Sequence, residues 1–355
     1  MRVLVTGIDG YIGSVMGPFL VRAGHDVVGL DTGYFRAGLL YESGEDHPPI
    51  LTRDTRMVGP ADLAGFDSVV HLAELSNDPL GEHRPAITFA INHKGTMALA
   101  QAAKAAGVKR FVFSSSCSVY GVGGDDVKSE TSLPLPQTAY AECKVLCERG
   151  LASLNDDTFV TTCIRNATAF GASPRMRFDI VLNNLAGLAW TTRKIAMTSD
   201  GTPWRPLVHV LDICKAVALI LVSPQEVVGG QVFNIGDDSQ NYQIREVAEI
   251  VARQFPGCTT SFGQPGMDNR SYRVSFAKIR EHCPEFRCDW SAERGATQLA
   301  RLFAWLDMSH ETFAAAPFTR LAQLKCLAER GEIDDDYFWT DPFDGDRIPT
   351  APEAA

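Results

Sequence analysis

Three glycines spaced three residues apart constrain this chain more than any other feature of its sequence. Gly7, Gly10 and Gly13 directly follow a strand-like segment over residues 2–6 and open a helical pattern over residues 12–23. In a strand–turn–helix context, such glycines permit a tight turn, a close approach of the backbone to a pyrophosphate and tight packing of helix on strand. The free N–H groups at the helix start then face the phosphates. The sequence therefore predicts a dinucleotide-binding turn at its beginning.

The first half of the chain alternates short β-branched runs with helical patterns. The candidate strands span residues 2–6, 26–30, 68–72, 110–114 and 159–164, and the candidate helices span 12–23, 85–106 and 138–154. Alternating strands and helices predict an α/β fold with a doubly wound, Rossmann-like parallel sheet. In such a sheet, ligands bind beyond the carboxyl ends of the strands.

After about residue 170 the pattern loosens, and the candidate helices 178–191, 210–221, 244–254 and 292–306 are separated by loops rich in glycine and proline. We predict a dinucleotide-binding domain over residues 1–170, rejoined by about 205–238. A smaller C-terminal substrate lobe is predicted from 171–204 and 239–310, followed by a C-terminal extension over 311–355 with an amphipathic segment at 318–330.

The charge of the chain limits its partners. Its 355 residues include 33 basic and 43 acidic side chains, a net charge of −10. An acidic surface argues against a nucleic-acid partner, although a local basic pocket can still bind a small anion. No apolar run approaches the roughly 20 residues of a membrane helix, and the N-terminus lacks the organisation of a signal peptide. We therefore expect a cytoplasmic protein with no membrane and no nucleic-acid partner.

The cysteines favour a reduced protein without a metal site. They number nine, are scattered along the chain and lie in a sequence without an export signal. Cys143 and Cys147 lie four residues apart, and Cys283 and Cys288 five apart, but no histidine or cysteine partners of a zinc site join either pair. We therefore predict that the protein holds no metal.

Two acidic residues follow candidate strands at positions suited to an adenosine. Asp31 ends the second strand, 24 residues after Gly7. A carboxylate there can accept hydrogen bonds from both ribose hydroxyls and would repel a 2′-phosphate, which favours NAD over NADP. Asp54 follows a third strand-like piece and could accept a hydrogen bond from the adenine amine. The alternative for both is a solvated loop carboxylate.

Tyr140 and Lys144 are the pair on which a catalytic assignment depends. They lie four residues apart on the helix predicted over 138–154 and therefore share one face. A tyrosine with its usual pKa of about 10 is a poor base at neutral pH, and a nearby ammonium favours the phenolate, so we expect Lys144 to lower the pKa of Tyr140. Ser116, beyond a buried strand, is placed to hydrogen-bond the substrate oxygen that Tyr140 deprotonates. The alternatives are a solvent-facing helix pair and serines that only cap the strand.

Together these motifs resemble the extended short-chain dehydrogenase/reductase family, and more narrowly its NAD-dependent nucleotide-sugar epimerase/dehydratase branch, which includes the proteins similar to UDP-glucose 4-epimerase. The resemblance covers about residues 1–290. It rests on the glycine turn, Asp31, Leu72-Ala73, Asn92-His93-Lys94-Gly95-Thr96, Ser114-Ser115-Ser116-x-x-Val119-Tyr120-Gly121, Tyr140-x-x-x-Lys144 and Arg205-Pro206-Leu207-Val208-His209-Val210-x-Asp212.

The resemblance implies a role for each matching position. It implies Tyr140 as the acid/base, Lys144 as the residue that binds the nicotinamide ribose, and Ser116 as an assistant in proton transfer. The residues assigned to NAD are Gly7, Gly10, Tyr11, Ile12, Gly13, Asp31, Asp54, Leu72, Ala73, Asn92 and Lys144. The residues assigned to a nucleotide-sugar substrate are Ser116, Cys117, Thr168, Asn184, Arg205 and Arg270, with Arg205 at the pyrophosphate. His209 is expected to be structural.

The departures from the family pattern bear on the reaction. Sugar 4,6-dehydratases of this branch carry acidic residues just after the serine or threonine, and related decarboxylases carry a glutamate at the position of Ser118. Cys117 and Ser118 stand there in this chain, which argues against both reactions. Thr168 replaces an asparagine that holds substrate in 4-epimerases, Gln264 stands where a second pyrophosphate arginine is usual, and Glu74 replaces a small residue near the cofactor. Nucleotide and sugar therefore remain open.

The pattern as a whole favours an NAD-dependent nucleotide-sugar epimerase that acts at C4. In this hypothesis Tyr140 takes a hydroxyl proton while hydride leaves the same carbon for NAD, and the transient keto-sugar is reduced again on its opposite face. The alternatives are a keto-sugar reductase or oxidase, a 3,5-type epimerase that uses Cys117, and a catalytically silent dinucleotide sensor. The resemblance also implies a homodimer formed through the helices over 85–106 and 138–154.

Overall fold

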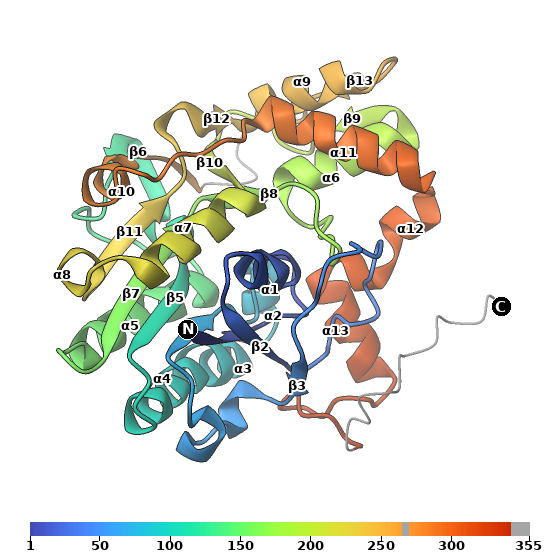
Figure 1. Cartoon of the computed structure of the whole chain (residues 1–355). Coiled ribbons are helices and arrows are strands. Elements are labelled where there is room, and N and C mark those ends of the chain that lie inside the picture. Colours follow the sequence, from blue (N-terminus) through green and yellow to red (C-terminus); the bar gives the residue numbers. More distant parts are fainter. Residues whose placement is uncertain (265–269, 342–355) are drawn as a thin grey trace.

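Seven parallel strands form the central sheet (Figure 1) in a computed structural model that describes residues 1–264 and 270–341. From edge to edge the strands are β11 (Gln231–Ile235), β7 (Val160–Asn166), β5 (Arg110–Ser116), β4 (Ser68–His71), β1 (Arg2–Thr6), β2 (Asp26–Asp31) and β3 (Ile50–Thr52). The chain thus steps outward from β1 in both directions, as in a doubly wound sheet. The predicted Rossmann-like fold class is confirmed.

The sequence predicts five of these strands, with ends that differ by at most two residues. The predicted strand over 110–114 extends further because Ser115 and Ser116 pair with Arg165 and Asn166 of β7. Two serine hydroxyls therefore stand at the last paired positions of a buried strand. The edge strand β3, the strand-like piece before Asp54, is only three residues long and is exposed throughout.

Helices cover both faces of the sheet (Figure 1). Helices α1 (Gly13–Arg22) and α7 (Val210–Val222) pack on one face, and α4 (Thr96–Ala105) and α5 (Ala139–Leu154) on the other. Successive residues of β1 alternate between the two faces, because Val3 and Val5 join the cluster under α1 and α7 while Leu4 joins the cluster under α4 and α5. Strands buried on both faces are expected to be apolar on both sides.

The helix predicted over 85–106 is interrupted in its middle. It begins as α3 (Pro85–Thr88), continues as a π-helical segment, η3 (Phe89–Gly95), and resumes as α4. A π-helical segment widens the turn and re-aims the residues within it, and such segments are frequent at functional sites. Here the segment contains Asn92, which is completely buried.

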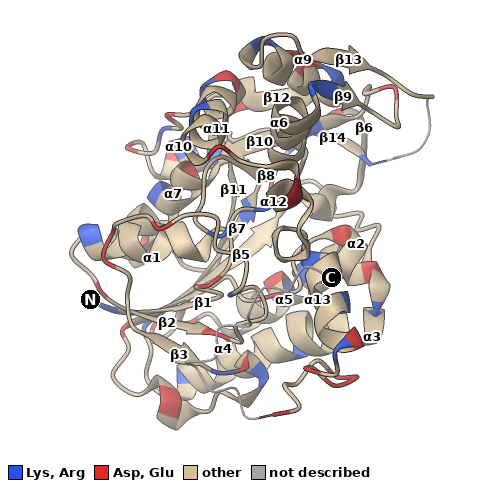
Figure 2. Ribbon diagram, turned by 90° about the vertical axis from the view of Figure 1, so that its right-hand side faces the viewer, with Lys and Arg blue, Asp and Glu red and all other residues tan. Residues whose placement is uncertain are grey.

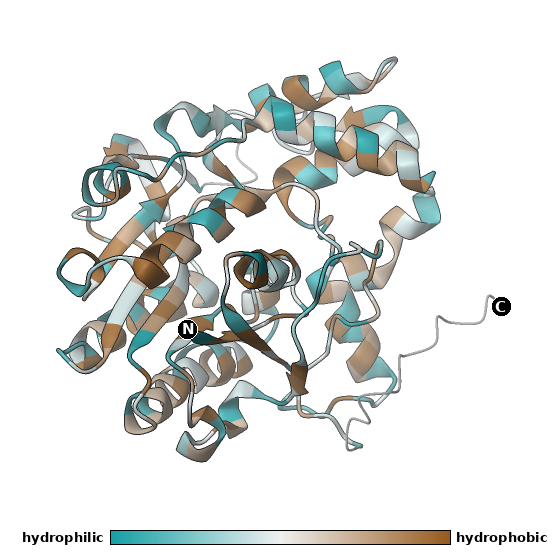
Figure 3. Cartoon of the chain, viewed as in Figure 1, coloured by the Kyte–Doolittle hydropathy of each residue, from teal (hydrophilic) through white to brown (hydrophobic). Residues whose placement is uncertain are grey.

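A second, smaller lobe is built on three helices that share one apolar cluster: α6 (Val181–Thr192), α9 (Ile244–Gln254) and α11 (Ala292–Leu306). Figure 2 shows them stacked beyond the central sheet. Helix α11 shows alternating hydrophobic and hydrophilic bands in Figure 3, as expected for a helix with one buried face. Helices α9 and α11 have the predicted ends, whereas α6 begins three residues after the predicted start because Ile180 is extended. The predicted domain boundaries stay a prediction.

The described part of the chain also contains three small sheets and several short helices. The sheets pair β8 (Thr168–Phe170), β10 (Trp204–His209) and β12 (Asn241–Gln243); β9 (Lys194–Ala196) with β13 (Thr259–Ser261); and β6 (Val122–Lys128) with β14 (Ser271–Val274). The short helices are α2 (Asp78–His83), α8 (Gln225–Val228), α10 (Ala277–His282) and the 3₁₀ turns η1 (Thr55–Met57), η2 (Pro60–Leu63), η4 (Cys117–Tyr120) and η5 (Asp238–Gln240).

The C-terminal extension packs on both lobes, because Phe318 joins the apolar cluster of the second lobe while its last helix packs on the lobe that holds the glycine turn. It forms α12 (His310–Ala314), the 3₁₀ turn η6 (Ala316–Phe318) and α13 (Arg320–Glu329). Leu324 and Leu327 of α13 share an apolar cluster with Tyr34, which follows β2, and Leu80 of α2. The polar tail beyond residue 341 lies outside the described residues. None of the described helices is both long and apolar enough to cross a membrane.

Candidate active site

A cavity of about 580 Å³ lies where the carboxyl ends of the central strands meet the second lobe. Sixteen of the predicted site residues line it: Gly7, Gly10, Tyr11, Ile12, Gly13, Asp31, Asp54, Leu72, Ala73, Ser116, Tyr140, Lys144, Thr168, Asn184, Arg205 and Arg270. The structure therefore brings residues from both lobes and from most of the sequence into one space. Asn92 and Cys117 do not line this cavity.

The glycine turn is shaped for a ligand that approaches its backbone closely. Gly7 has a φ of +75°, and a Cβ at this position would lie 2.8 Å from the backbone nitrogen of Ala73. A Cβ on Gly13 would collide with the carbonyl oxygen of Gly7. Because α1 begins at Gly13, the N–H groups of its first turn point toward the same end of the cavity. A pyrophosphate is the group that such a cradle fits.

Asp31 lies beside this turn with spare hydrogen-bonding capacity. Its two carboxylate oxygens accept hydrogen bonds from the backbone N–H groups of Asp9, at 3.0 Å, and Gly33, at 2.8 Å. Each oxygen keeps a lone pair for a further donor such as a ribose hydroxyl. Burial and the neighbouring Asp9 raise the pKa of Asp31 to about 6. These features fit the adenosine ribose of a dinucleotide.

Asp54 also lines the cavity, but its carboxylate is already engaged. It accepts hydrogen bonds from the Arg56 side chain, at 3.0 Å from Nε and 2.6 Å from Nη2, and from the Arg56 backbone at 2.8 Å. The carboxylate thus caps the short η1 turn. A contact between Asp54 and an adenine amine would have to share these oxygens with Arg56.

Ser116, Tyr140 and Lys144 meet at the middle of the cavity. Ser116 ends β5, and its Oγ accepts a hydrogen bond from the Ser118 backbone at 3.1 Å, which leaves the Ser116 hydroxyl proton for another acceptor. Tyr140 and Lys144 share one face of α5, whose first turn is capped by the side chain of Thr138. The Lys144 ammonium lies 5.3 Å from the centre of the Tyr140 ring.

Glu74 changes the electrostatics of this group. Its carboxylate forms an ion pair with Lys144, which also donates to the carbonyl oxygen of Ser114, and both charged side chains are nearly inaccessible, at 2% and 4% exposure. Burial raises the pKa of Glu74 to about 7, although Lys144 opposes this. Burial acts to lower the pKa of Lys144, but the charges of Glu74 and Tyr140 and the hydrogen bond with Glu74 together outweigh burial and raise that pKa.

Lys144 acts to lower the pKa of Tyr140, as expected, but that pKa is nevertheless raised in the protein without ligands. Burial raises the pKa of Tyr140 above its usual value of 10.0, and the charges of Glu74 and Asp78 raise it further. Lys144 and a hydrogen bond with Ser116 act in the opposite direction but do not prevail. The main physical reason is that burial disfavours the phenolate more than the ammonium favours it, and the Glu74 carboxylate adds to the effect of burial.

Asn92 does not line the cavity but contacts Leu75, which does. Its side-chain oxygen accepts a hydrogen bond from the Leu75 backbone N–H at 2.8 Å, and its side-chain nitrogen donates to the Leu75 carbonyl at 3.0 Å. Both ends of the amide are thus committed to the loop that carries Glu74 and Ser76 into the cavity. Asn92, which the resemblance assigns to NAD, therefore contacts this loop and does not line the cavity.

Cys117 faces away from the cavity. It is 1% exposed, and its Sγ donates to the carbonyl oxygen of Arg165 at 3.2 Å. Burial raises the pKa of this thiol well above its usual range. Like the other eight cysteines, it forms no disulfide. The structure therefore does not bring Cys117 to the substrate, whereas the neighbouring Ser118 does line the cavity.

Two arginines define the end of the cavity in the second lobe. Arg205 of β10 donates to the carbonyl oxygens of Trp204, at 2.8 Å, and Arg270. Arg270 forms an ion pair with Asp78 at the start of α2. Cations at this end suit a second phosphate group, distinct from the one at the glycine turn. His209, by contrast, is completely buried and stacks on Trp290 at 4.0 Å, which confirms its structural role.

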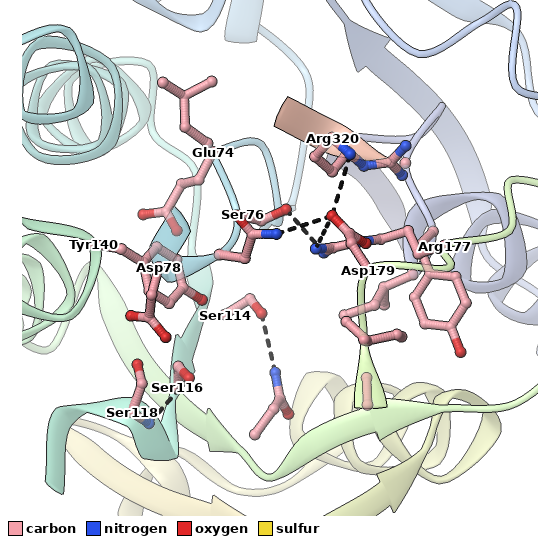
Figure 4. A pocket seen from close by; sticks show the side chains of 18 of the residues that line it. Glu74, Ser76, Asp78, Ser114, Ser116, Ser118, Tyr140, Arg177, Asp179 and Arg320 are labelled. Atoms are coloured by element: carbon pink, nitrogen blue, oxygen red, sulfur yellow. Dashed lines mark hydrogen bonds and ion pairs between the residues drawn. The ribbon is translucent and has the colours of Figure 1, made fainter. Parts of the chain in front are cut away.

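Sequence reasoning missed a charged cluster between these two ends (Figure 4). Arg177 donates to Asp179 at 2.7 and 3.1 Å and to Ser76 at 3.1 Å, and Asp179 also accepts from Asn77 and from the backbone of Arg320. These residues come from the loop before α6, the loop after β4 and the C-terminal extension. The only sign of unusual charge in this region that the sequence showed was Glu74, which replaces a small residue of the family pattern. Among the described residues, no group of three or more potential metal ligands is found.

The parallel sheet, the glycine turn and the Ser–Tyr–Lys group define a dinucleotide-binding protein of the Rossmann type. Residues 3–236 match the model of the NAD dependent epimerase/dehydratase family, about two-thirds of the chain. The chain belongs to this family. The predicted family and the predicted cofactor, NAD, are therefore confirmed.

Individual proteins to which the chain is similar include named enzymes and ligand complexes. The chain is 30% identical over 266 residues to a UDP-glucose 4-epimerase of Corynebacterium glutamicum, which covers 70% of this chain and 79% of that protein. The solved structure of MoeE5 with UDP-glucuronic acid and NAD is similar at a TM-score of 0.73 and 27% identity, covering 86% of this chain and 99% of the other. A NAD-dependent NDP-hexosamine 5,6-dehydratase, TunA, has the same fold at a TM-score of 0.77 and 22% identity, with coverages of 86% and 99%.

Proposed function

We propose that this protein is an NAD-dependent nucleotide-sugar epimerase that inverts C4 through a transient keto-sugar. The observation that carries the proposal is the convergence of Ser116, Tyr140 and Lys144 on a cavity that continues from the glycine turn to Arg205. One end fits a dinucleotide, the other end offers cations to a nucleotide diphosphate, and the acid/base group lies between them. The similarity to UDP-glucose 4-epimerases at about 30% identity supports this substrate class.

The residues of the chain have separate tasks in this proposal. Tyr140 accepts the proton of the C4 hydroxyl and later returns it, while the Ser116 hydroxyl holds the same oxygen in place. Lys144 and the ligand together favour the phenolate form of Tyr140. NAD, when bound, supplies a hydride acceptor at the carbon that carries this hydroxyl. The glycine turn and Asp31 would hold NAD, and Arg205 and Arg270 would hold the substrate pyrophosphate.

The surroundings of Tyr140 argue against elimination of water. The positions after Ser116 offer a buried thiol at Cys117 and a hydroxyl at Ser118, not a carboxylic acid. The two carboxylates near Tyr140 are held in ion pairs, Glu74 with Lys144 and Asp78 with Arg270. Neither carboxyl group stands at the positions just after Ser116, where the dehydratases of this branch carry their acidic residues. This supports epimerisation over dehydration.

The decisive experiment is an NMR time course in D₂O with UDP-, dTDP- and GDP-hexoses. We expect a C4 epimer that carries no deuterium on carbon, because hydride leaves and returns without exchange with solvent. Deuterium on a ring carbon would contradict the proposal and indicate C–H proton chemistry, such as 3,5-epimerisation or dehydration. Stoichiometric consumption of added cofactor would indicate a reductase or oxidase, and binding without any turnover a dinucleotide sensor.

The predicted homodimer, formed through the helical segments over 85–106 and 138–154, stays a proposal. Sedimentation velocity of the purified chain tests it, because a dimer has twice the chain mass of 38.7 kDa.

A further inference from the structure

Arg320 lies in the C-terminal extension, and its side chain is buried beside the cavity. It is the first residue of α13, it is 3% exposed, and it lines the cavity. Its guanidinium lies 4.0 Å from the centre of the Phe35 ring, and Phe35 lines the same cavity. In Figure 4 Arg320 lies next to Arg177 and Asp179, on the opposite side of the view from Tyr140.

The carboxylates around Arg320 are committed to other arginines. Asp179 forms a two-point ion pair with Arg177, and it meets Arg320 through the backbone N–H. Asp9 pairs with Arg36 at 2.9 Å and with Arg175 at 3.6 Å. Within residues 1–264 and 270–341, the guanidinium of Arg320 has no ion pair and no hydrogen bond. Arg320 is therefore a buried cation without an ion-pair partner among the described residues.

A buried guanidinium without a counter-charge is costly, since burial removes it from water and nothing replaces the lost interactions. The environment of Arg320 reflects this, because burial and the charge of Arg177 lower its pKa to about 9, against the attraction of Asp179 and Asp31. Buried charges in proteins are normally paired. An anion bound in the cavity would supply the missing partner.

We propose that Arg320 binds the pyrophosphate of NAD, so that the C-terminal extension completes the cofactor site. Its guanidinium lies over the Phe35 ring. It is also close enough to Asp31, at the adenosine end, and to Arg177 for both charges to act on it. The pyrophosphate of a dinucleotide lies between the adenosine and the nicotinamide, beside the glycine turn. A planar guanidinium can contact two phosphate oxygens at once. The inference rests on the NAD-binding part of the proposed function and not on the C4 chemistry.

A pyrophosphate could also come from a nucleotide-sugar. That ligand has cations of its own in Arg205 and Arg270, at the other end of the cavity. Arg320 belongs instead to the end built by the glycine turn, Asp31 and Phe35. The experiment below separates the two sources by comparing cofactor fragments with the substrate.

Isothermal titration of the full-length protein, after removal of NAD, tests the assignment with NAD, ADP and adenosine. Arg320→Met keeps an apolar side chain against Phe35 but removes the charge. We expect this variant to bind ADP and NAD about 10- to 100-fold more weakly and to bind adenosine as the wild type does, because adenosine carries no phosphate. Arg320→Lys should recover part of the loss. Lys325→Gln, an exposed cation on the same helix, should leave all three affinities unchanged.

Thermal unfolding provides a second readout. Without ligand, Arg320→Met should unfold no earlier than the wild type, since an unpaired buried charge has been removed, but NAD should raise its Tm by less. Affinity for ADP within about twofold of the wild type would overturn the assignment, as would an equal loss for ADP and adenosine. Weaker binding of UDP-glucose in the same titration, with unchanged NAD affinity, would assign Arg320 to the substrate. None of these results depends on epimerisation, so failure of the C4 proposal is recognised separately.

Discussion

The buried carboxylate of Glu74 is ion-paired with Lys144, and its second oxygen, Oε1, has no hydrogen-bond partner in the described part of the chain. The pair lies beside Tyr140, whose pKa it influences in two opposite directions. The charge of Lys144 favours the phenolate of Tyr140, and the charge of Glu74 opposes it. Glu74 is a positioning and tuning residue in this arrangement, and it can be tested apart from Tyr140.

Glu74→Gln should shift the pH dependence of turnover. Removing the negative charge leaves the Lys144 ammonium free to favour the phenolate, so the pKa of Tyr140 falls and the ascending limb of kcat/KM moves to lower pH. Glu142→Gln on the exposed side of α5 serves as the control and should leave the profile in place. A profile for Glu74→Gln that coincides with the wild type would show that Glu74 does not act on Tyr140.

The same substitution should change how the stability of the ligand-free protein depends on pH. Burial raises the pKa of Glu74 from its usual 4.5 to about 7, so the folded state holds a proton that the unfolded state has released. A carboxyl with a raised pKa destabilises the fold as pH rises between these values, by about 1.4 kcal/mol per pH unit. In urea titrations from pH 5 to 8, we expect the wild type to lose stability relative to Glu74→Gln. A constant difference would mean that Glu74 stays ionised in the fold.

Tyr140→Phe should abolish proton transfer and leave the cofactor in place. Loss of a general acid/base typically costs a factor of about 10²–10⁴ in rate, and we expect kcat to fall by that amount. The NAD content per chain, measured after denaturation, should remain that of the wild type. Tyr242→Phe removes a hydroxyl that contacts Gln240 outside the cavity, and it should retain full activity. Near-normal turnover in Tyr140→Phe would refute the catalytic assignment.

The parts of the site that could be predicted are those encoded locally. Gly7 and Gly13 are needed for a turn that the chain makes within seven residues, and Tyr140 and Lys144 share a helix face because of their spacing. Ser116 could be placed because the strand before it is buried and its carboxyl end faces the site. Each of these features depends on one element and its immediate neighbours.

The rest depends on contacts between distant segments, which periodicity does not show. Arg320 reaches the cavity from a helix 307 residues after Gly13, and Asp179 accepts a hydrogen bond from Asn77, 102 residues earlier in the chain. Glu74 was visible as an unusual residue, but its partner Lys144 lies 70 residues further on. Asp54 was placed at an adenine, whereas Arg56, two residues later, binds its carboxylate.

Cys117→Ala should be nearly silent in turnover. The thiol points to the carbonyl oxygen of Arg165 and away from the cavity, so we expect kcat within about twofold of the wild type and a stability loss of about 1 kcal/mol. Ser118→Ala is the informative comparison, because the Ser118 side chain lines the cavity and its buried hydroxyl has no partner among the described residues. A loss of activity in Cys117→Ala, with deuterium incorporation in the wild type, would instead favour a 3,5-type epimerase.

Asn92→Ala should lower the stability of the ligand-free protein, because Asn92 holds a loop and does not contact the reacting atoms. The Asn92 amide satisfies both the N–H and the carbonyl of Leu75, at 2.8 and 3.0 Å, so its removal leaves two backbone groups without these partners. At about 1–3 kcal/mol for each, we expect the free energy of unfolding to fall by about 2–6 kcal/mol in urea titrations without ligand. Asn92→Asp keeps the acceptor for the N–H but loses the donor to the carbonyl, and it should lose about half as much. NAD affinity should weaken in parallel, because the loop that carries Glu74 into the cavity is no longer held. If Asn92 contacted the nicotinamide directly, Asn92→Ala would lose activity while the ligand-free protein kept its full stability, and the positioning role would be wrong.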